Sequence, residues 1–252
     1  MKLGINICIV IPCYNEEKGF LLEEYSSFIE KNHKILLCFV NDGSTDNTLT
    51  ILALLKNKYS QKVEIVSYEK NKGKAEAVRN GIHYCNDRYE HKYVAYLDAD
   101  LSTSLQECIS LTKYFDKKIE FVFGSRIAKI GSVIDRKNSR FLIGRIIATI
   151  ISNMLTIAVY DTQCGCKLFT KNLSKQIFVD SFISKWLFDV EIFFRIIEIH
   201  EKENALRKMV EVPLTKWIHS ENSKVNVTYF FNLWFDLYNI RRKYKNTGRP
   251  SQ

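Results

Sequence analysis

Four short apolar runs at nearly constant spacing constrain the fold of this 252-residue chain more than any other feature. They begin near residues 5, 35, 63 and 92. A strand and the helix that returns the chain to the next parallel strand together take roughly thirty residues. The spacing therefore predicts an α/β fold of the Rossmann-like kind, in which helices flank a mostly parallel sheet.

Each apolar run ends in a cluster of polar residues. The carboxyl ends of parallel strands meet at one edge of the sheet, and ligands of open α/β sheets bind at that edge. We therefore expect the clusters to form one site, in which helix N-termini favour a bound diphosphate. The candidate residues at this edge are Pro12, Tyr14, Glu16, Asp42, Lys74, Asp98 and Asp100.

The pair Asp98 and Asp100, directly after the fourth run, predicts a divalent metal site. Two neighbouring carboxylates raise one another's pKa unless a cation lies between them. Mg²⁺ and Mn²⁺ prefer such oxygen ligands, and they commonly bind a diphosphate as well. An isolated Asp-x-Asp sequence is often only a solvated turn, so the prediction depends on the polar clusters around it.

The length and composition predict one large α/β domain. The chain is 46% hydrophobic and 26% charged, and with three prolines and ten glycines it contains no obvious flexible linker. Its seven cysteines are odd in number and scattered, which is typical of reduced core residues in a cytosolic protein. Cys164 and Cys166 lack the second pair, or the nearby histidine, that a zinc site requires.

The first residues run directly into the first strand, which leaves no room for a secretory signal. Residues 146–160 form the longest apolar stretch, but this stretch is too short and too polar to span a bilayer alone. We expect it to be a helix that packs on the domain or lies against a membrane. The protein is therefore predicted to stay in the cytoplasm, on the cytosolic face of a membrane.

A formal net charge of +9 indicates an anionic partner. No nucleic-acid-binding motif is present, which favours a membrane surface over nucleic acid. Residues 225–252 are predicted to form an amphipathic helix and tail after a catalytic domain of residues 1–224. Aromatic and basic residues of this kind hold helices at membrane surfaces, although the aromatic face could instead cover the sheet. The residues are Tyr229, Phe230, Phe231, Trp234, Phe235 and Tyr238, followed by Arg241, Arg242, Lys243, Lys245 and Arg249.

Further blocks occur downstream in a fixed order. They are Gly124-Ser125-Arg126, Asp161-Thr162-Gln163-Cys164-Gly165-Cys166-Lys167-Leu168-Phe169, Trp186-Leu187-Phe188-Asp189-Val190-Glu191, Glu211-Val212-Pro213 and Asn222-Ser223-Lys224. With the upstream clusters, they resemble the family 2 glycosyltransferases of the GT-A fold. Within that family, the chain resembles the group of dolichyl-phosphate β-glucosyltransferases and dolichyl-phosphate mannose synthases. The resemblance extends over residues 7–224.

This resemblance implies a nucleotide-sugar site at the edge of the sheet. Pro12, Tyr14 and Glu16 are expected to frame the nucleotide, Asp42 to accept a hydrogen bond from its base, and Lys74 to lie nearby. Turn formation and packing are the alternative roles for Pro12 and Tyr14. For Asp42, the alternative is ordinary turn chemistry.

The resemblance also assigns roles to the acidic pair. Asp98 contacts the ribose or the metal, and Asp100 binds Mg²⁺ or Mn²⁺ and, through it, the diphosphate. The metal assists departure of the nucleoside diphosphate as a Lewis acid. Related mannosyltransferases often carry a further glutamine ligand where this chain has Ser102, so the third ligand stays open.

Three basic residues are expected to face phosphate by resemblance: Arg126, Arg140 and Lys224. The planar guanidinium of arginine donates two parallel hydrogen bonds to phosphate oxygens. Either arginine could instead form a surface ion pair. Trp217 occupies a position where mannose synthases carry an arginine, and it is closer to the glucosyl group, which favours UDP-glucose as the donor.

The family's chemistry inverts the anomeric centre. A hydroxyl acceptor needs a general base, whereas a lipid phosphate is already ionised and needs positioning. Asp189 is the favoured base, with anchoring of its helix as the alternative. Asp161 is the second candidate, with shaping of the acceptor pocket as its alternative role. Glu191 lies two residues from Asp189 on a helix and cannot share its face. By resemblance, Gly165 permits close backbone approach and Gln163 hydrogen-bonds the sugar.

The sequence thus predicts a peripheral membrane enzyme that transfers a hexose from a nucleotide sugar to a polyprenyl phosphate. Transfer to a glycan hydroxyl is the first alternative, and a basic nucleotide- or membrane-binding module without activity is the second. A sugar nucleotidyltransferase would need a glycine-rich opening, and a dinucleotide-dependent oxidoreductase would need Gly-x-Gly-x-x-Gly after the first strand. Residues 12–17 supply neither of these motifs.

Overall fold

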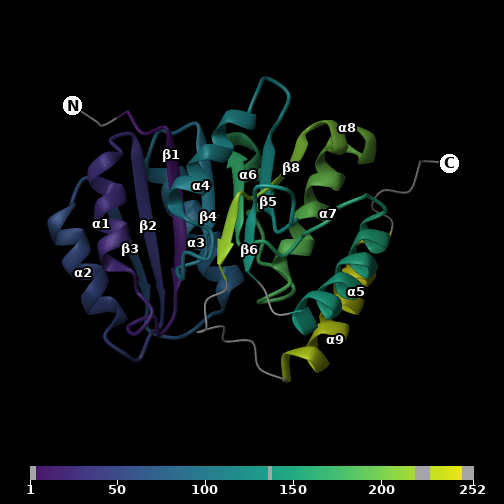
Figure 1. The fold of residues 1–252 in the computed structure, drawn as a ribbon, viewed down its shortest axis with the longest axis horizontal. Helices are drawn as coiled ribbons and strands as arrows, with labels where there is room; N and C mark the ends of the chain where they lie inside the picture. The colour runs from purple at the N-terminus through teal and green to yellow at the C-terminus, as the bar shows by residue number, and fades with distance from the viewer. Residues whose placement is uncertain (1–3, 136–137, 219–227, 246–252) are drawn as a thin grey trace.

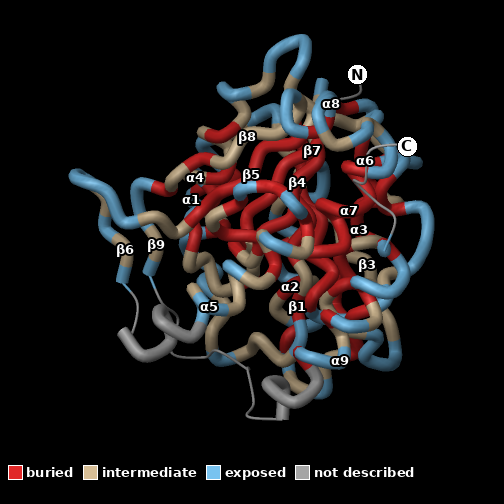
Figure 2. The backbone as a smooth tube through the Cα atoms, turned by 90° about the vertical axis from the view of Figure 1, so that its right-hand side faces the viewer, coloured by how far each residue is buried: buried red, intermediate tan, exposed pale blue. Residues whose placement is uncertain are grey.

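The computed structural model describes residues 4–135, 138–218 and 228–245, with side chains left out for residues 138–143 and 228–232. A central sheet of seven strands separates two layers of helices (Figure 1). Its strand order is β3-β2-β1-β4-β7-β5-β8, and a separate pair of short parallel strands, β6 and β9, lies at the margin of the domain (Figure 2). The predicted α/β fold is therefore confirmed.

The strands alternate their side chains between two apolar layers, because successive residues of a strand point to opposite faces. In β1, Ile7, Ile9 and Ile11 face one layer, while Cys8 and Val10 face the other. All five are almost fully buried, as Figure 2 shows for the centre of the sheet. The strands are β1 (Ile7–Cys13), β2 (Ile35–Asp42), β3 (Val63–Tyr68), β4 (Tyr93–Leu97), β5 (Phe121–Ser125), β6 (Val133–Asp135), β7 (Cys166–Thr170), β8 (Met209–Pro213) and β9 (Lys216–Ile218).

The helices divide between the two faces. Buried residues of α1, α2 and α4 belong to one core, and those of α3, α5, α6, α7 and α9 belong to the other. The helices are α1 (Leu22–Lys31), α2 (Thr48–Lys58), α3 (Lys74–Arg88), α4 (Leu105–Ser110), α5 (Asn138–Leu155), α6 (Lys171–Ile177), α7 (Phe188–His200), α8 (Lys202–Arg207) and α9 (Thr228–Lys243), with a 3₁₀ turn η1 (Leu111–Tyr114) after α4.

Strand β7 determines how the site is assembled. It pairs antiparallel with both β4 and β5, whereas β1, β2, β3 and β4 are parallel to one another. Its first residue, Cys166, lies opposite Leu97, the last residue of β4. The turn of residues 161–165 that precedes β7 therefore lies at the same edge as Asp98 and Asp100.

The C-terminal helix α9 packs on the domain through one face and exposes another. Leu233, Leu237, Ile240 and Tyr244 are buried in the core shared with α5 and α7. These positions are separated by four, three and four residues, the period of one helix face. The aromatic residues Trp234, Phe235 and Tyr238 are exposed instead. These three aromatic side chains therefore do not cover the sheet, contrary to the alternative for them.

The predicted helix at residues 146–160 is α5, which begins earlier and ends at Leu155. Across the described residues, no helix combines the length and apolar character needed to cross a bilayer. The proposed boundary at residue 224 falls in the segment 219–227, outside the described residues, and stays a prediction.

Candidate active site

The loops after β1 and β2 are joined by hydrogen bonds at the edge of the sheet. The backbone N–H of Asn15 donates to Ser44 Oγ at 3.0 Å, and that of Glu16 donates to Thr48 Oγ1 at 2.8 Å. Asn15 has φ of 51°, a strained value that this network holds in place. Tyr14, just before it, exposes 38% of its surface. These hydrogen bonds hold the two loops, which carry the predicted nucleotide-framing residues, in one arrangement. Pro12 is half-buried near the end of β1.

Asp42 fixes the loop that leads into α3. Its two carboxylate oxygens accept the backbone N–H groups of Lys72 and Gly73, each at 2.8 Å. The adjacent Gly43 has φ of +67°, and a Cβ at this position would lie 2.5 Å from Asn71 N. The turn chemistry given as the alternative for Asp42 is therefore present. Each oxygen keeps a second acceptor site, so the predicted hydrogen bond from a base stays a prediction.

Lys74, the first residue of α3, is the cation nearest the acidic pair among the described residues. Its Nζ lies 2.6 Å from Asp98 Oδ1. Burial lowers the pKa of Lys74, but the charges of Asp98, Asp189 and Asp100 outweigh it and raise the pKa overall. Lys74 therefore stays charged and offsets part of the repulsion between the two carboxylates.

The charged form of the Asp100 carboxyl is disfavoured in the fold. Burial, followed by the nearby charge of Asp98, raises the pKa of the Asp100 carboxyl. The N–H of Ser102 donates to its Oδ1 at 2.9 Å, and Leu101 between them has φ of 51°. Ser102 thus supports Asp100 through its backbone. A carboxylate that is destabilised by burial and by a like charge is suited to accept a cation.

Gly165 lies directly against Asp98. A Cβ at Gly165 would lie 2.0 Å from Asp98 Oδ2, and the backbone N–H of Asp98 donates to Gly165 O at 3.2 Å. The predicted close approach at this glycine is therefore confirmed. The residue that fits against the acidic pair comes from the turn that the antiparallel β7 brings to this edge.

Replacing Gly165 by Ala is expected to displace the Asp98 carboxylate and to lower sugar transfer about 100-fold, since a small misplacement of a reacting group has that effect. The matched control is Gly144→Ala in α5, where an added Cβ would meet nothing within 4 Å. Steady-state transfer and thermal unfolding should be measured for both variants. Wild-type transfer by Gly165→Ala would show that the position of Asp98 is not critical.

Arg126 and Asp161 form a two-pronged ion pair. Arg126 Nε donates to Asp161 Oδ2 at 2.7 Å, and Nη2 donates to Oδ1 at 2.8 Å. The guanidinium also lies over the Trp217 ring, 5.4 Å from its centroid. Glu211 holds the turn by accepting the N–H groups of Tyr160 and Asp161 at 3.0 and 2.8 Å. The alternative of an ion pair for Arg126 is thus observed, while Nη1 has no hydrogen bond to a described residue.

The Arg126–Asp161 pair predicts a pH dependence of stability. Burial raises the pKa of Asp161, but Arg126 outweighs it, so the pKa falls from 3.8 to about 2. A lowered carboxyl pKa stabilises the fold above the unfolded value, and this stabilisation is lost as pH falls toward 2. Asp161→Asn should lower the unfolding free energy by about 2 kcal/mol at pH 6 and by much less near pH 2.

Urea unfolding at both pH values measures this difference. The exposed Asp87→Asn in α3 is the matched control, which should change stability little. An equal loss at both pH values for Asp161→Asn would mean that the carboxylate charge does not stabilise the turn.

Asp189, in the first turn of α7, is buried in a cluster with Lys167 and Tyr96. Lys167 Nζ, which is fully buried, lies 2.5 Å from Asp189 Oδ1 and donates to Cys164 O at 2.7 Å. The Tyr96 hydroxyl also donates to Asp189 Oδ1. These contacts match the anchoring alternative for Asp189 at the start of α7. Its assignment as a general base stays a prediction, and the carboxylate already has two partners.

Glu191 lies elsewhere, as expected for a residue two positions from Asp189. It is buried in α7 and accepts hydrogen bonds from Arg195 and Tyr244, each at 2.9 Å. Lys167 and Glu211 stand in the motif blocks, but neither they nor Tyr96 had a predicted role. A lysine inside the apolar strand Cys166–Thr170 was the available signal.

The structure gives few contacts for the remaining predicted residues, Gln163, Arg140 and Lys224. The backbone N–H of Gln163 donates to Asp161 Oδ1 at 3.1 Å, and its buried Nε2 has no partner among the described residues. Arg140 belongs to the first turn of α5, but its side chain lies outside the described part of the chain. Lys224 lies outside the described residues altogether. The roles of these three residues stay predictions.

The acidic pair fits a divalent cation that shares its coordination with a substrate. Within the described residues, no group of three or more His, Cys, Asp or Glu side chains could enclose a metal ion. Mg²⁺ is commonly held by one or two carboxylates together with substrate phosphates, and Asp98 and Asp100 supply two. The close packing of Gly165 leaves room for the carboxylate of Asp98 at this edge.

Comparisons with known proteins agree with this architecture. A model of "Glycosyl transferase family 2" matches residues 8–178. The human dolichyl-phosphate beta-glucosyltransferase is 30% identical over 84% of this chain and 71% of its own length. The dolichyl-phosphate beta-glucosyltransferase of Saccharomyces cerevisiae is 29% identical over 88% of this chain and 69% of its own.

Solved structures share the fold. Glucosyl-3-phosphoglycerate synthase from Mycobacterium tuberculosis, in complex with Mn²⁺, UDP-glucose and phosphoglyceric acid, has a TM-score of 0.68 at 16% identity. The alignment covers 100% of this chain and 83% of that structure. Mannosyl-3-phosphoglycerate synthase from Rubrobacter xylanophilus has a TM-score of 0.70 at 16% identity. The alignment covers 99% of this chain and 77% of that structure. The predicted GT-A fold is thereby confirmed.

The family model covers well over half of the chain, and the relatives match along most of their length. The alternative of a binding module without activity is therefore wrong. The resemblance inferred from the motifs is confirmed. The chain belongs to glycosyl transferase family 2 and is a glycosyltransferase.

Proposed function

We propose that this enzyme transfers a hexose, with glucose favoured, from a nucleoside diphosphate sugar to a polyprenyl phosphate, with inversion at the anomeric carbon. The observation that carries the proposal is the acidic pair Asp98 and Asp100, packed on Gly165, in a chain 30% identical to a dolichyl-phosphate beta-glucosyltransferase. UDP-glucose is the favoured donor.

The donor half of the site is formed by the loops after β1, β2 and β4. Asp98 and Asp100 would hold Mg²⁺ or Mn²⁺ together with the diphosphate, and the bound metal supplies Lewis-acid assistance to the leaving group. Lys74 contributes a further positive charge 2.6 Å from Asp98. The linked loops at Asn15 and Glu16 keep this half rigid, so less order must be imposed when the donor binds.

Arg126 supports a phosphate acceptor. Its Nε and Nη2 are oriented by Asp161, which leaves Nη1 to donate to an incoming oxygen. A phosphate oxygen is already anionic and can attack without a general base. This fits a site in which Asp189 is already bonded to Lys167 and Tyr96. A glycan hydroxyl acceptor, by contrast, would require one of these carboxylates to take a proton.

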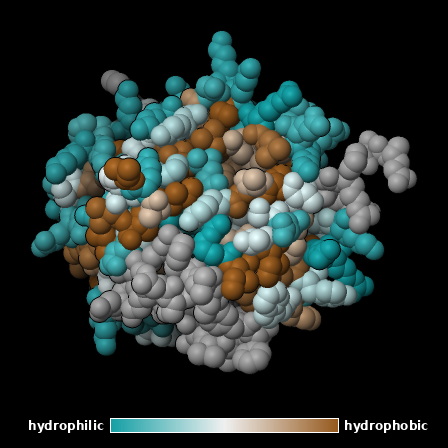
Figure 3. Space-filling model, turned by 45° about the vertical axis from the view of Figure 1, so that its right-hand side comes forward, coloured by the Kyte–Doolittle hydropathy of each residue, from teal (hydrophilic) through white to brown (hydrophobic). Residues whose placement is uncertain are grey.

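The same proposal places the enzyme at the cytosolic face of a membrane, where a polyprenyl phosphate is accessible. The exposed Trp234, Phe235 and Tyr238 of α9 support this position, since amphipathic helices bury such rings at the membrane interface. Figure 3 shows hydrophobic patches among hydrophilic side chains on the face turned toward the viewer.

The test is transfer of radiolabelled sugar into solvent-extractable polyprenyl phosphate. UDP-glucose should be compared with UDP-galactose, UDP-N-acetylglucosamine and GDP-mannose, with Mg²⁺ or Mn²⁺ and with EDTA. We expect a lipid product from UDP-glucose that EDTA abolishes. Donor hydrolysis without lipid product would indicate a glycan hydroxyl acceptor, and a lipid product from another donor would correct the sugar.

A further inference from the structure

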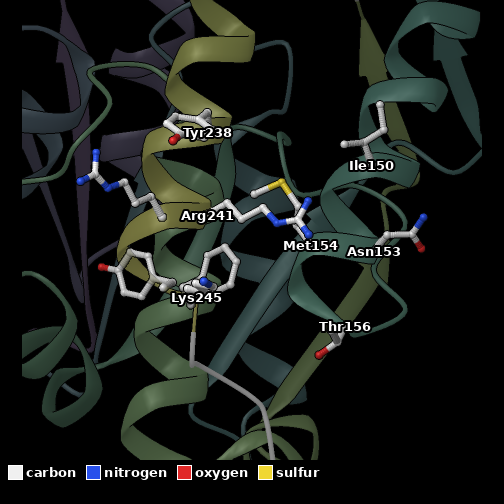
Figure 4. A pocket seen from close by; sticks show the side chains of 10 residues that line it. Ile150, Asn153, Met154, Thr156, Tyr238, Arg241 and Lys245 are labelled. Carbon is white, nitrogen blue, oxygen red and sulfur yellow. The ribbon is translucent and has the colours of Figure 1, made fainter.

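A cavity of about 680 Å³ opens between α5, α7 and α9 (Figure 4). None of the residues that line it belongs to the candidate active site. Ile150 and Met154 extend from α5 toward α9, and Arg241 extends from α9 toward Met154 (Figure 4). The cavity therefore has an apolar wall on one helix and a basic wall on the other. We call it the α5–α9 cavity.

The lining of the α5–α9 cavity is positively charged. Arg241, Arg242 and Lys245 contribute three cations, and no carboxylate is present among its lining residues. Among the described residues, none of the three has an ion-pair partner, whereas the neighbouring Lys243 lies 3.3 Å from Glu191. Unpaired basic groups gathered around one concave space are complementary to an anion, and two arginines favour a phosphate.

The apolar part of the lining favours a ligand with a hydrocarbon portion. Ile150 and Met154 are half-buried, and Phe194 of α7 is almost fully buried behind them. A small soluble anion would leave this wall uncovered. An amphiphile with a phosphate headgroup would cover the apolar wall and the basic wall together.

The cavity is continuous with the exposed aromatic face of α9. Trp234, Tyr238 and Arg241 are separated by four and three residues, so they form one stripe along α9, and Lys245 follows two residues after the helix ends. Trp234 and Tyr238 expose 55% and 61% of their surface. The adjacent stripe, from Leu233 to Tyr244, lies one residue earlier and so about 100° around the helix, and it is buried against the domain.

We infer that the α5–α9 cavity binds the headgroup phosphate of an anionic membrane phospholipid, with Arg241, Arg242 and Lys245 on the phosphate and the acyl region against Ile150 and Met154. The lipid is an anchor, distinct from the acceptor at the catalytic edge. This inference rests on the proposed function only in that both place the enzyme at a membrane. It adds a specific lipid site where the proposed function requires none.

Cosedimentation with vesicles tests the inference without donor or metal. Phosphatidylcholine vesicles are compared with phosphatidylcholine vesicles that contain phosphatidylglycerol. The triple variant Arg241→Gln/Arg242→Gln/Lys245→Gln should bind the anionic vesicles roughly 100-fold more weakly, at about five-fold for each basic side chain near an anionic surface. The control Lys31→Gln/Lys34→Gln/Lys117→Gln removes as many exposed charges elsewhere and should bind almost like the wild type.

A second variant separates the cavity from diffuse charge attraction. Ile150→Trp places a larger apolar ring in the cavity between the α5 wall and Arg241, and it leaves the net charge unchanged. It should weaken binding to anionic vesicles about tenfold, because the phosphate loses its charge-assisted hydrogen bonds. Circular dichroism and thermal unfolding verify that each variant is folded.

Three results would overturn the inference: equal losses in the two triple variants, wild-type vesicle binding by Ile150→Trp, or release of the protein from anionic vesicles by millimolar inorganic phosphate at constant ionic strength. Transfer to a short-chain polyprenyl phosphate without vesicles tests the proposed function separately. The triple variant should retain that transfer. If the wild type lacks transfer but binds anionic vesicles through the cavity, the proposed function fails and the lipid site stands.

Discussion

Replacing Asp100 by Asn is expected to lower sugar transfer roughly 1,000-fold, because the half-buried pair would lose one of the two carboxylates proposed to hold the metal that assists the leaving diphosphate. The same change should not destabilise the protein. Burial and Asp98 already raise the pKa of the Asp100 carboxyl, so the charged form is disfavoured in the fold. Melting temperature without metal should therefore stay within about 4 °C of the wild type or increase.

Metal affinity should be measured for Asp100→Asn together with its activity and stability, because the predicted loss of activity follows from the loss of a metal ligand. Mn²⁺ binding followed by electron paramagnetic resonance should weaken in Asp100→Asn. It should be unchanged in Asp87→Asn, which removes an exposed carboxylate of α3. Transfer by Asp100→Asn at wild-type rates, or unchanged Mn²⁺ affinity, would remove the acidic pair from the mechanism. Loss of activity with an unfolded protein would mean that Asp100 is structural.

Replacing Lys167 by Met is expected to destabilise the protein by about 3–5 kcal/mol, because it leaves the buried Asp189 carboxylate without its counter-ion. Lys167 is fully buried, and its ammonium group lies 2.5 Å from Asp189 and 2.7 Å from Cys164 O. The side chain therefore connects the start of α7 to the turn that contains Gly165. Urea unfolding at neutral pH measures the loss.

A double-mutant cycle tests whether the charge pair causes that loss. Adding Asp189→Asn to Lys167→Met removes the unpaired charge, so the double variant should be more stable than the single Lys167 variant. Additive effects would show that packing, rather than ion pairing, causes the loss. The active-site consequence can be measured in the same variants, because a displaced turn should lower transfer as Gly165→Ala does.

The sequence predicted the first half of the fold well. Apolar runs at regular spacing required parallel strands, and β1 to β4 lie in the predicted arrangement. It did not reveal that β7 runs antiparallel between β4 and β5. Cys166–Thr170 is only five residues long and contains a lysine, and pairing direction depends on contacts between distant parts of the chain. Local pattern could not supply that information.

The site was predictable as a set of residue types but less so as a set of contacts. The resemblance predicted a close backbone approach at Gly165 but not its neighbour, which the structure shows to be Asp98. The partners of Asp189 were not predicted, because a lysine is ordinarily exposed, and although Lys167 lies in an apolar strand, the strand pattern alone does not show which buried group its ammonium meets. Likewise, only the fold brings Asp161 to Arg126, which lies thirty-five positions earlier in the chain.

The reversed strand β7 lies between the two halves of the proposed site. Under the proposed function, the residues that hold the donor are complete by Asp100, whereas Arg126 and Asp161, which would meet the acceptor, come later in the chain, with β4 and β7 as the seam between them. Gly165 is the point at which the two halves are coupled, because it packs on Asp98. Chimeras joined at this seam are therefore expected to exchange acceptor preference between family members only where they keep a glycine at this position.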